Sequence, residues 1–479
     1  MPYSKAFCEE SARRPNVVLI MADDLGYGEL GCYGQEKIRT PRLDQMAKEG
    51  LRFTQFYAGS PVCAPSRCVL MTGKHAGHAS IRDNRETPPE GQLPLPAGEV
   101  IIPELLKEQD YATAMIGKWG LGVYDTTGDP LKPGRFDSFF GYLCQAQAHN
   151  HYPGWLWKNK EKLDLKDEEA TEKLGRPGRG TFTAFEQFGT TFTGDLFEQQ
   201  AIEFLRQHKE KPFFLYLPLT VPHVSLQVPD DSLREYEDKW EDPPYDGKKF
   251  GYLAHETPRA AYAAMVTRLD RSVGRILDEL KALELEENTL VIFTSDNGPA
   301  PLNVGGSDSK FFESAGPLRG LKGEAYEGGI RVPCIARWPG KIKAEKESSV
   351  PLAFYDVLPT LCELTGAATP KNLDGISFLP TLLGREEQKQ HDFLYWEFAS
   401  YGGYQAVRMG DWKAIRPRLK RGDATIELYH LADDPGEQKN LAEDHPDLVK
   451  QGEEIMAAQH VPSKEFPLPT IDTPIKKAP

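Results

Sequence analysis

The chain has 479 residues, too many for one small hydrophobic core, so a large domain together with a smaller one is expected. Its 71 acidic side chains outnumber its 57 basic ones, and the formal net charge is −14. So acidic a chain is unsuited to general binding of nucleic acid or of an anionic membrane, and an anionic substrate would require a local cluster of cations.

The chain shows no export or membrane signal. No stretch reaches the roughly 18 apolar residues of a membrane span. Residues 1–16 lack an apolar segment, so no signal peptide is visible, and we expect a cytoplasmic protein or one whose export signal was removed. The seven cysteines form neither metal-type pairs nor a dense disulfide framework, and their odd number leaves at least one outside any intramolecular disulfide.

Four short apolar runs, VVLIMADD, ATAMIGKWG, PFFLYLPLTVPH and TLVIFTSDNG, predict buried strands. Continuous apolar runs of this length are typical of parallel strands that are covered on both faces. Their polar ends are, in chain order, Asp23 with Asp24, Lys118, His223, and Asp296 with Asn297. Because ligands bind beyond the carboxyl ends of the strands in such sheets, we expect these side chains to line one site.

Helical spacing of apolar residues predicts helices between these strands, from the Thr40-Pro41 capping signal to Gly50 and over 259–283. Beyond about residue 385 the pattern changes to short alternating strands and a closing helix near the C-terminus. The expected fold class is therefore α/β. A large, mostly parallel mixed central sheet flanked by helices is assigned to residues 1–385, and a smaller antiparallel α+β subdomain to residues 386–479.

The charged stretch 158–180, which ends in Gly and Pro, is expected to be a surface insertion. The histidines at positions 75 and 78 are expected to be structural. Neither feature is assigned a part in the chemistry.

A candidate metal site consists of Asp23, Asp24, Asp296 and Asn297. Adjacent acids are more often a solvated turn or a helix cap, but two such groups at the ends of buried strands favour a shared ion. Carboxylate and amide oxygens suit a hard cation, and Ca²⁺ tolerates irregular geometry better than Mg²⁺ does.

The stretch PVCAPSRCVLMTGK places Cys63 at the start of a predicted helix, with Pro65 and Ser66 in its first turn. A helix N-terminus favours an anion, and Arg67 follows on the same helix. A buried structural thiol is the plain interpretation of Cys63, and a reactive centre beside the metal is the functional one.

The sequence C-x-P-S-R followed by LMTGK resembles the signature of the formylglycine-dependent sulfatases. Further stretches resemble that family in its order along the chain: PNVVLIMADDLGYGELGCYG, GKWGLG, VPH, SDNG, GLKGEAYEGGIRVP and ELYHLADDPGEQKNLA. The resemblance implies an alkaline-phosphatase-like fold and a sulfatase activity. It also implies that a maturation enzyme oxidises the cysteine to formylglycine, and it favours a periplasmic or secreted protein if a signal was removed.

The resemblance assigns a role to each candidate residue. The implied Ca²⁺ ligands are Asp23, Asp24, Asp296 and Asn297, with the modified Cys63 completing the shell. Arg67 matches the arginine that holds the formylglycine, and His223 matches the histidine beside the leaving oxygen. Lys118 and Lys322 match the lysines that grip the sulfate.

The implied mechanism explains these residue types. A sulfate monoester is anionic and repels an ordinary nucleophile, and a metal with a Lys/Arg clamp offsets that charge. One hydroxyl of the hydrated aldehyde, oriented by Asp296, attacks sulfur while His223 protonates the leaving alcohol. The second hydroxyl then loses its proton, and sulfate is expelled as the aldehyde is restored.

One departure from the family is Gly120, which stands where the family often has histidine after Gly-Lys-Trp. Glycine cannot accept the proton that must leave before sulfate departs. The stretch QAQAHNHYPGWLW, residues 145–157, offers His149 and His151 instead, although loop histidines that pack among aromatics are the alternative. His149 is favoured, and an extended backbone would put both histidines on one side.

The same stretch also bears on the substrate. Trp155 is either a core aromatic or part of a platform for a sugar, and like the two histidines it is a candidate substrate contact. The AHN-x-YP pattern after FFGY resembles bacterial sulfatases that act on galactose or N-acetylgalactosamine sulfates, so a sulfated saccharide is expected. Two alternatives stay open, a phosphonate or phosphodiester hydrolase on the same scaffold and a non-catalytic protein that binds sulfated sugars.

Overall fold

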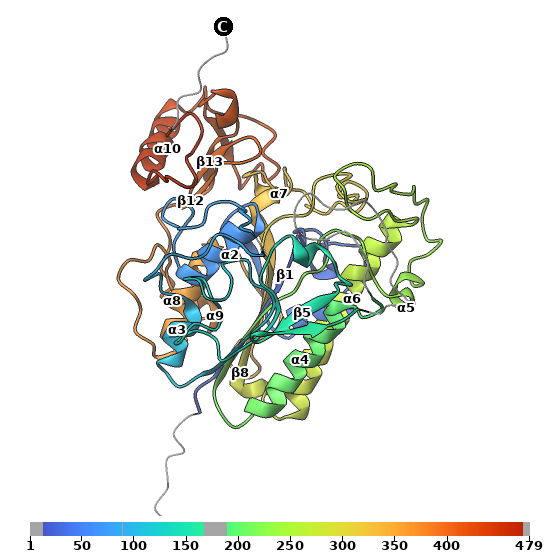
Figure 1. Ribbon diagram of the computed structural model, residues 1–479. Helices are drawn as coiled ribbons and strands as arrows, with labels where there is room; N and C mark the ends of the chain where they lie inside the picture. The colour runs from blue at the N-terminus through green and yellow to red at the C-terminus, as the bar shows by residue number, and fades with distance from the viewer. Residues whose placement is uncertain (1–12, 89, 167–188, 473–479) are drawn as a thin grey trace, which may run out of the picture.

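A mixed sheet of eleven strands forms the centre of the computed structural model, which describes residues 13–88, 90–166 and 189–472 (Figure 1). Its hydrogen-bonded order is β10-β2-β9-β8-β1-β7-β3-β4-β5-β6, and β11 also pairs with β2. In chain order the strands are β1 (Asn16–Ala22), β2 (Leu51–Tyr57), β3 (Ala112–Lys118), β4 (Ser138–Tyr142), β5 (Trp155–Lys158), β6 (Glu161–Asp164), β7 (Phe213–Pro218), β8 (Thr289–Ser295), β9 (Arg331–Arg337), β10 (Lys346–Ser348) and β11 (Leu352–Ala353).

The middle of this sheet is parallel. β1 lies between β7 and β8 and is parallel to both, and β3 continues the parallel pairing from β7 to β4. Every residue of β1 and of β8 is buried, as continuous apolar runs require. Antiparallel pairs occur towards the edges, where β9 joins β8 to β2 and β5 forms a hairpin with β6.

Helices cover both faces of the sheet (Figure 1). They are α1 (Pro41–Lys48), α2 (Cys63–Thr72), α3 (Ile102–Lys107), α4 (Thr193–His208), α5 (Asp230–Leu233), α6 (Pro258–Ala282), α7 (Glu327–Ile330), α8 (Val357–Thr365), α9 (Leu379–Leu382) and α10 (Pro446–Gln459). The odd-numbered residues 17–21 of β1 join one hydrophobic cluster with α2, α3 and α8, and the even-numbered residues 18–22 join another with α1, α4 and α6.

The C-terminal part of the chain forms a second, antiparallel sheet of four strands, at the top of Figure 1. Its strands are β12 (Leu394–Phe398), β13 (Tyr404–Met409), β14 (Trp412–Arg416) and β15 (Glu427–His430). α10 packs on β13 and β14 around a third small cluster. The expected fold class is therefore confirmed, whereas the boundary at residue 385 stays a prediction.

One local prediction needs correction. β7 ends at Pro218, not at His223, because Pro218 and Pro222 have no N–H to donate to a neighbouring strand; His223 lies in the loop that follows. The predicted 158–180 surface insertion is described only in part. Residues 158–164 belong to the β5–β6 hairpin, whose β6 arm is exposed, and residues 167–180 lie outside the described part of the chain.

The structure also bears on the membrane and disulfide predictions. Within the described ranges, no helix is both long enough and apolar enough to cross a bilayer. The six cysteines of those ranges are free thiols.

Candidate active site

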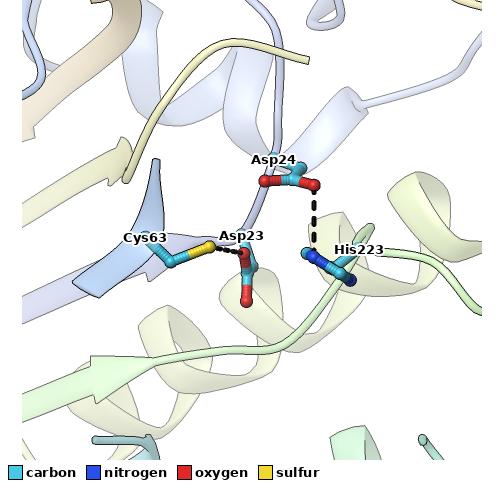
Figure 2. Close-up of side chains that lie close together, drawn as sticks. All are labelled: Asp23, Asp24, Cys63 and His223. Carbon is cyan, nitrogen blue, oxygen red and sulfur yellow. Dashed lines mark hydrogen bonds and ion pairs between the residues drawn. The ribbon is translucent and has the colours of Figure 1, made fainter. Parts of the chain in front are cut away.

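The strand ends that the sequence singled out converge on Cys63. Asp23 and Asp24 follow β1, Lys118 ends β3, and Asp296 follows β8, while Cys63 opens α2 above them. The Asp24 N–H donates to Asp296 Oδ1 at 3.1 Å, which ties the ends of β1 and β8 together. Figure 2 shows that the thiol of Cys63 points towards Asp23.

Cys63 lies between opposite charges. Its Sγ is 3.5 Å from Asp23 Oδ1 and 3.5 Å from Lys322 Nζ. Burial, together with the charge of Asp23, raises the pKa of the Cys63 thiol to about 12. An unmodified Cys63 is therefore a protonated thiol near neutral pH and a poor nucleophile, because the thiolate is the reactive form.

Each predicted cation pairs with a predicted metal-binding carboxylate. The shortest distances, all between buried groups, are 2.6 Å from Lys118 Nζ to Asp23 Oδ2, 2.7 Å from Arg67 Nη2 to Asp296 Oδ2, and 2.7 Å from Lys322 Nζ to Asp24 Oδ1. The pairs bring three positive and three negative charges together among buried side chains.

The pKa values of the three carboxyl groups are shifted in different directions. Burial by itself would raise the pKa of Asp23, but the neighbouring cations, led by Lys118, outweigh it and hold that pKa well below its usual value. Burial raises the pKa of Asp24, and burial with the charge of Asp23 raises the pKa of Asp296 to about 6. Carboxylates that burial drives towards the neutral form are stabilised in the charged form by an added cation.

Asn297 carries an acceptor that fits such a cation. Its Nδ2 donates to Asp24 Oδ1 at 2.8 Å, whereas its Oδ1 is buried without a hydrogen-bond partner. A buried carbonyl oxygen beside carboxylates is a ligand that Ca²⁺ and Mg²⁺ both accept. Ligand atoms of Asp23, Asp24, Cys63 and His223 also lie within 4.8 Å of one another.

Of the three predicted histidines, His223 contacts Asp24, and the other two contact His223. His223 Nε2 is 3.5 Å from Asp24 Oδ2, and Figure 2 shows its ring turned towards that carboxylate. The ring of His149 stacks on the ring of His223, with 4.1 Å between centroids and 19° between planes. His151 lies behind them, because its Nε2 is 2.9 Å from His223 O and its Nδ1 is 3.2 Å from Thr220 Oγ1.

The backbone around the two histidines is extended only in part. Asn150 between them is extended, with φ −113° and ψ 117°, whereas Gln147–His149 form a 3-10 turn. The turn puts the His149 ring beside the His223 ring, whereas His151 contacts the His223 backbone. Burial lowers the pKa of His149 well below its usual value, with His223 adding to the effect, and burial lowers the pKa of His151 to about 4.

Gly120 leaves room for a residue that the sequence did not indicate. Its φ is +74°, and a Cβ built there would lie 1.8 Å from Nε2 of Gln145. The Gln145 side chain is buried, and neither its Oε1 nor its Nε2 has a hydrogen-bond partner. No spacing rule singles out this glutamine, although it opens the stretch that was chosen for its histidines.

Trp155 and His75, which the sequence also singled out, contact residues outside the cluster around Cys63. Trp155 belongs to the β5–β6 hairpin, where its ring lies 3.6 Å from Lys162 Nζ and packs edge-on against Trp157. His75 Nδ1 accepts the Gly77 N–H, and its Nε2 contacts Gln459 Oε1, so both ring nitrogens have a hydrogen-bond partner. These contacts agree with a structural role for His75.

Known proteins share both the sequence and the fold. The chain matches the family model described as Sulfatase over residues 15–367, and the model described as N-sulphoglucosamine sulphohydrolase, C-terminal, over residues 322–459. It is 32% identical to the steryl-sulfatase of Mus musculus, over 93% of this chain and 81% of that protein. It is 29% identical to the N-acetylgalactosamine-6-O-sulfatase of Bacteroides thetaiotaomicron, over 93% of each chain.

A solved structure gives the same result. The crystal structure of Ps i-CgsB in complex with k-i-k-neocarrahexaose has a TM-score of 0.75 and 27% identity to this chain, and 93% of each chain is covered. The family generally uses a formylglycine and a divalent metal, and the acidic cluster around Cys63 is a possible place for the metal. The match over most of its length therefore establishes that the chain belongs to the sulfatase family, with the alkaline-phosphatase-like fold, and is a sulfuric ester hydrolase.

Proposed function

We propose that this sulfatase removes sulfate from a sulfated carbohydrate of the galactose or N-acetylgalactosamine type, with formylglycine at residue 63 and a bound Ca²⁺. The observation that carries the proposal is the position of Cys63, 3.5 Å from both the Asp23 carboxylate and the Lys322 ammonium. The relatives named for N-acetylgalactosamine 6-sulfate and for a neocarrahexaose complex support a carbohydrate substrate.

The Ca²⁺ would be held by Asp23, Asp24, Asp296 and Asn297, together with the modified residue 63. Bound there, it would supply positive charge that offsets the charge of the sulfate. The three ion pairs of the cluster are neutral in sum, so a divalent cation makes the site net positive. That local charge is what an anionic substrate requires from a chain with a net charge of −14.

The residues around this centre bind the anion and move protons. Lys118 and Lys322 bind the sulfate oxygens, and Arg67 orients residue 63 from the same helix. His223 donates the proton to the leaving oxygen. Because its Nδ1–H donates to Val224 O, Nε2 is the nitrogen that faces the cluster, and His223 donates from Nε2 as the doubly protonated imidazolium.

Formylglycine at residue 63 would supply, as its hydrate, the hydroxyl that attacks sulfur. Its formation requires a maturation enzyme as a partner. His149, stacked on His223, is the candidate base that accepts the second proton before sulfate leaves.

Sulfate release from a panel of sulfated monosaccharides and disaccharides tests the substrate, and mass spectrometry of the peptide 61–67 tests the modification. We expect turnover of galactose- or N-acetylgalactosamine-type esters by protein that is at least partly converted at Cys63. Active protein that contains only the unmodified thiol would exclude the mechanism. Higher turnover of aryl phosphate esters than of aryl sulfate would favour the phosphohydrolase alternative.

Metal removal is a separate test. We expect exhaustive chelation to abolish turnover and added Ca²⁺ to restore it more fully than Mg²⁺. Asp296→Asn should bind less metal than the parent protein, because it removes a carboxylate ligand. Full activity in protein that metal analysis finds free of divalent ions contradicts the metal assignment.

A further inference from the structure

Tyr401 is an aromatic residue in an unfavourable backbone conformation at the protein surface. It lies in the loop between β12 and β13, its φ is +53°, and it is 56% exposed. A positive φ is rare for a bulky side chain, and backbone strain of this kind is concentrated at functional sites. The position of Tyr401 next to the active site explains why this backbone strain is retained.

The ring of Tyr401 lies on Gly323, the neighbour of Lys322. A Cβ built on Gly323 would come within 2.6 Å of Cδ1 and Cε1 of the tyrosine, so the ring occupies the space of a side chain there. The Gly323 N–H donates to Pro61 O at 2.9 Å, which ties this backbone to the segment that leads into Cys63. Tyr401 therefore flanks the site on the side of Lys322.

The electrostatic environment agrees with this position. Partial burial of its phenol raises the pKa of Tyr401, and Lys322, Asp24 and Cys63 also act on it. Burial likewise raises the pKa of Tyr252, on which Lys322, Asp24 and Tyr401 act. The two phenols thus lie within electrostatic range of each other and of the reactive centre.

Tyr252 lies beside the histidines of the cluster. Its ring is 5.9 Å from the ring of His149, which stacks on His223. Contacts connect the two tyrosines through the site. The ring of His223 contacts Asp24, and Lys322 pairs with the same carboxylate. Gly323 follows Lys322 in the chain and contacts Tyr401, which is the more exposed of the two tyrosines.

The loop that carries Tyr401 is anchored at its start. The Ser400 hydroxyl donates to Asp83 Oδ2, and the ring of Phe398, at the end of β12, lies 5.8 Å from the ring of Tyr401. Because these contacts hold the ring in place before a ligand binds, binding costs little additional conformational entropy.

We propose that Tyr401 is a substrate-positioning residue that packs its exposed ring against the sugar of the sulfate ester. The inference deepens the proposed function and rests on it. With the sulfate between Lys118 and Lys322, the leaving sugar extends towards solvent, past the ring beside Lys322. In a galactose-type ring the axial O4 leaves the C–H bonds of C3, C4 and C5 on the opposite face, an apolar surface that suits an aromatic ring.

Kinetics of formylglycine-bearing Tyr401→Ala and Tyr401→Phe test the proposal. The substrate is N-acetylgalactosamine 6-sulfate, and inorganic sulfate serves as an inhibitor that occupies the anion site alone. We expect Tyr401→Ala to raise KM about fivefold to tenfold, since it removes the aromatic face that packs against the sugar. Tyr401→Phe should stay within about twofold of the parent, and the Ki of sulfate should be unchanged in both.

The control variants separate a substrate contact from a structural role. Alanine and phenylalanine both keep the Cβ, so the backbone strain at φ +53° is the same as in the parent. A KM unchanged in Tyr401→Ala, a parallel rise of KM and of the sulfate Ki, or a loss in Tyr401→Phe equal to that in Tyr401→Ala overturns the inference. A parent protein that releases no sulfate from any ester of the panel instead contradicts the proposed function itself.

Discussion

Lys118 and Lys322 each contact a carboxylate that is also a candidate metal ligand. Lys118 pairs with Asp23 and Lys322 with Asp24, in both cases within 2.7 Å. Each lysine therefore has two effects under the proposed function, because it would offer charge to the sulfate and it neutralises a buried carboxylate. Removing one partner of a buried pair typically costs about 3–5 kcal/mol of stability.

We predict that Lys322→Ala lowers turnover of the preferred ester at least about tenfold and raises KM. A charge-assisted contact contributes about 1.5–3 kcal/mol, which corresponds to roughly one to two powers of ten. Steady-state kinetics measure the effect, and urea unfolding measures the accompanying loss of stability. Lys248→Ala, which removes an exposed ion pair with Asp246, is the matched control and should change neither. Unchanged kinetics in both Lys322→Ala and Lys118→Ala would mean that the anion binds elsewhere.

The two histidines of the 145–157 stretch should differ in kinetics. We predict that His149→Ala slows sulfate release more than ester cleavage, because it removes the ring beside His223 that accepts the second proton. Rapid-quench measurements should then show a burst of alcohol product, and mass spectrometry should show accumulated sulfated enzyme. His151→Ala should show no burst, since the contact between His151 and His223 is to the backbone oxygen of His223. Normal turnover of both variants assigns the base to solvent or to Lys118.

At the scale of the elements, the turn after β3 depends on Gly120. We predict that Gly120→Ala lowers the free energy of unfolding by at least about 1–2 kcal/mol, the cost of a left-handed conformation for a residue with a Cβ. The contact with Gln145 adds to this cost, although the end of that side chain can move. The double variant with Gln145→Ala should recover part of the loss, and strictly additive changes in denaturant unfolding would contradict the contact.

The sequence predicted the strands that build the candidate metal site, because apolar runs with polar ends specify parallel strands that open at one edge. It misplaced the end of β7, where prolines interrupt pairing before His223. It also could not place the His149 ring, whose position follows from a 3-10 turn that two neighbouring histidines do not signal. Tyr401 and Gly323 lie far apart along the chain, and no local pattern indicates that one covers the other.

At the scale of the whole molecule, a buried charge cluster joins the C-terminal sheet to the main one. Lys413 on β14 lies 3.0 Å from Glu327 on α7 and 3.0 Å from Glu437 in the loop after β15. Tyr57 of β2 donates to Glu327 at 2.6 Å, so the cluster reaches the central sheet. Because Tyr401 lies in the loop between two strands of the C-terminal sheet, these contacts also hold its ring beside Lys322.

This cluster makes stability depend on pH. Burial raises the pKa of Glu437 from its ordinary 4.5 to about 7. The folded state therefore binds that proton more tightly than the unfolded chain does, and the resulting stability is present below pH 4.5 and lost as the pH rises through about 7. We predict that the difference in unfolding free energy between pH 5 and pH 7.5 is smaller in Glu437→Gln than in the parent. Urea unfolding at the two pH values measures it, and equal differences in the two proteins would contradict the assignment.

The burial of Cys63 also sets an order of events during synthesis. Its side chain is 1% exposed in the folded protein, which closes it to any other macromolecule. One side of its enclosure is Lys322, which leaves the ribosome roughly 260 residues later, on the order of tens of seconds at ordinary rates of translation. The proposed modification of residue 63 thus has a time window that opens when this residue emerges and closes when the later chain folds over it. Under that proposal, the speed of folding, and not only the abundance of the maturation enzyme, determines what fraction of the molecules is ever active.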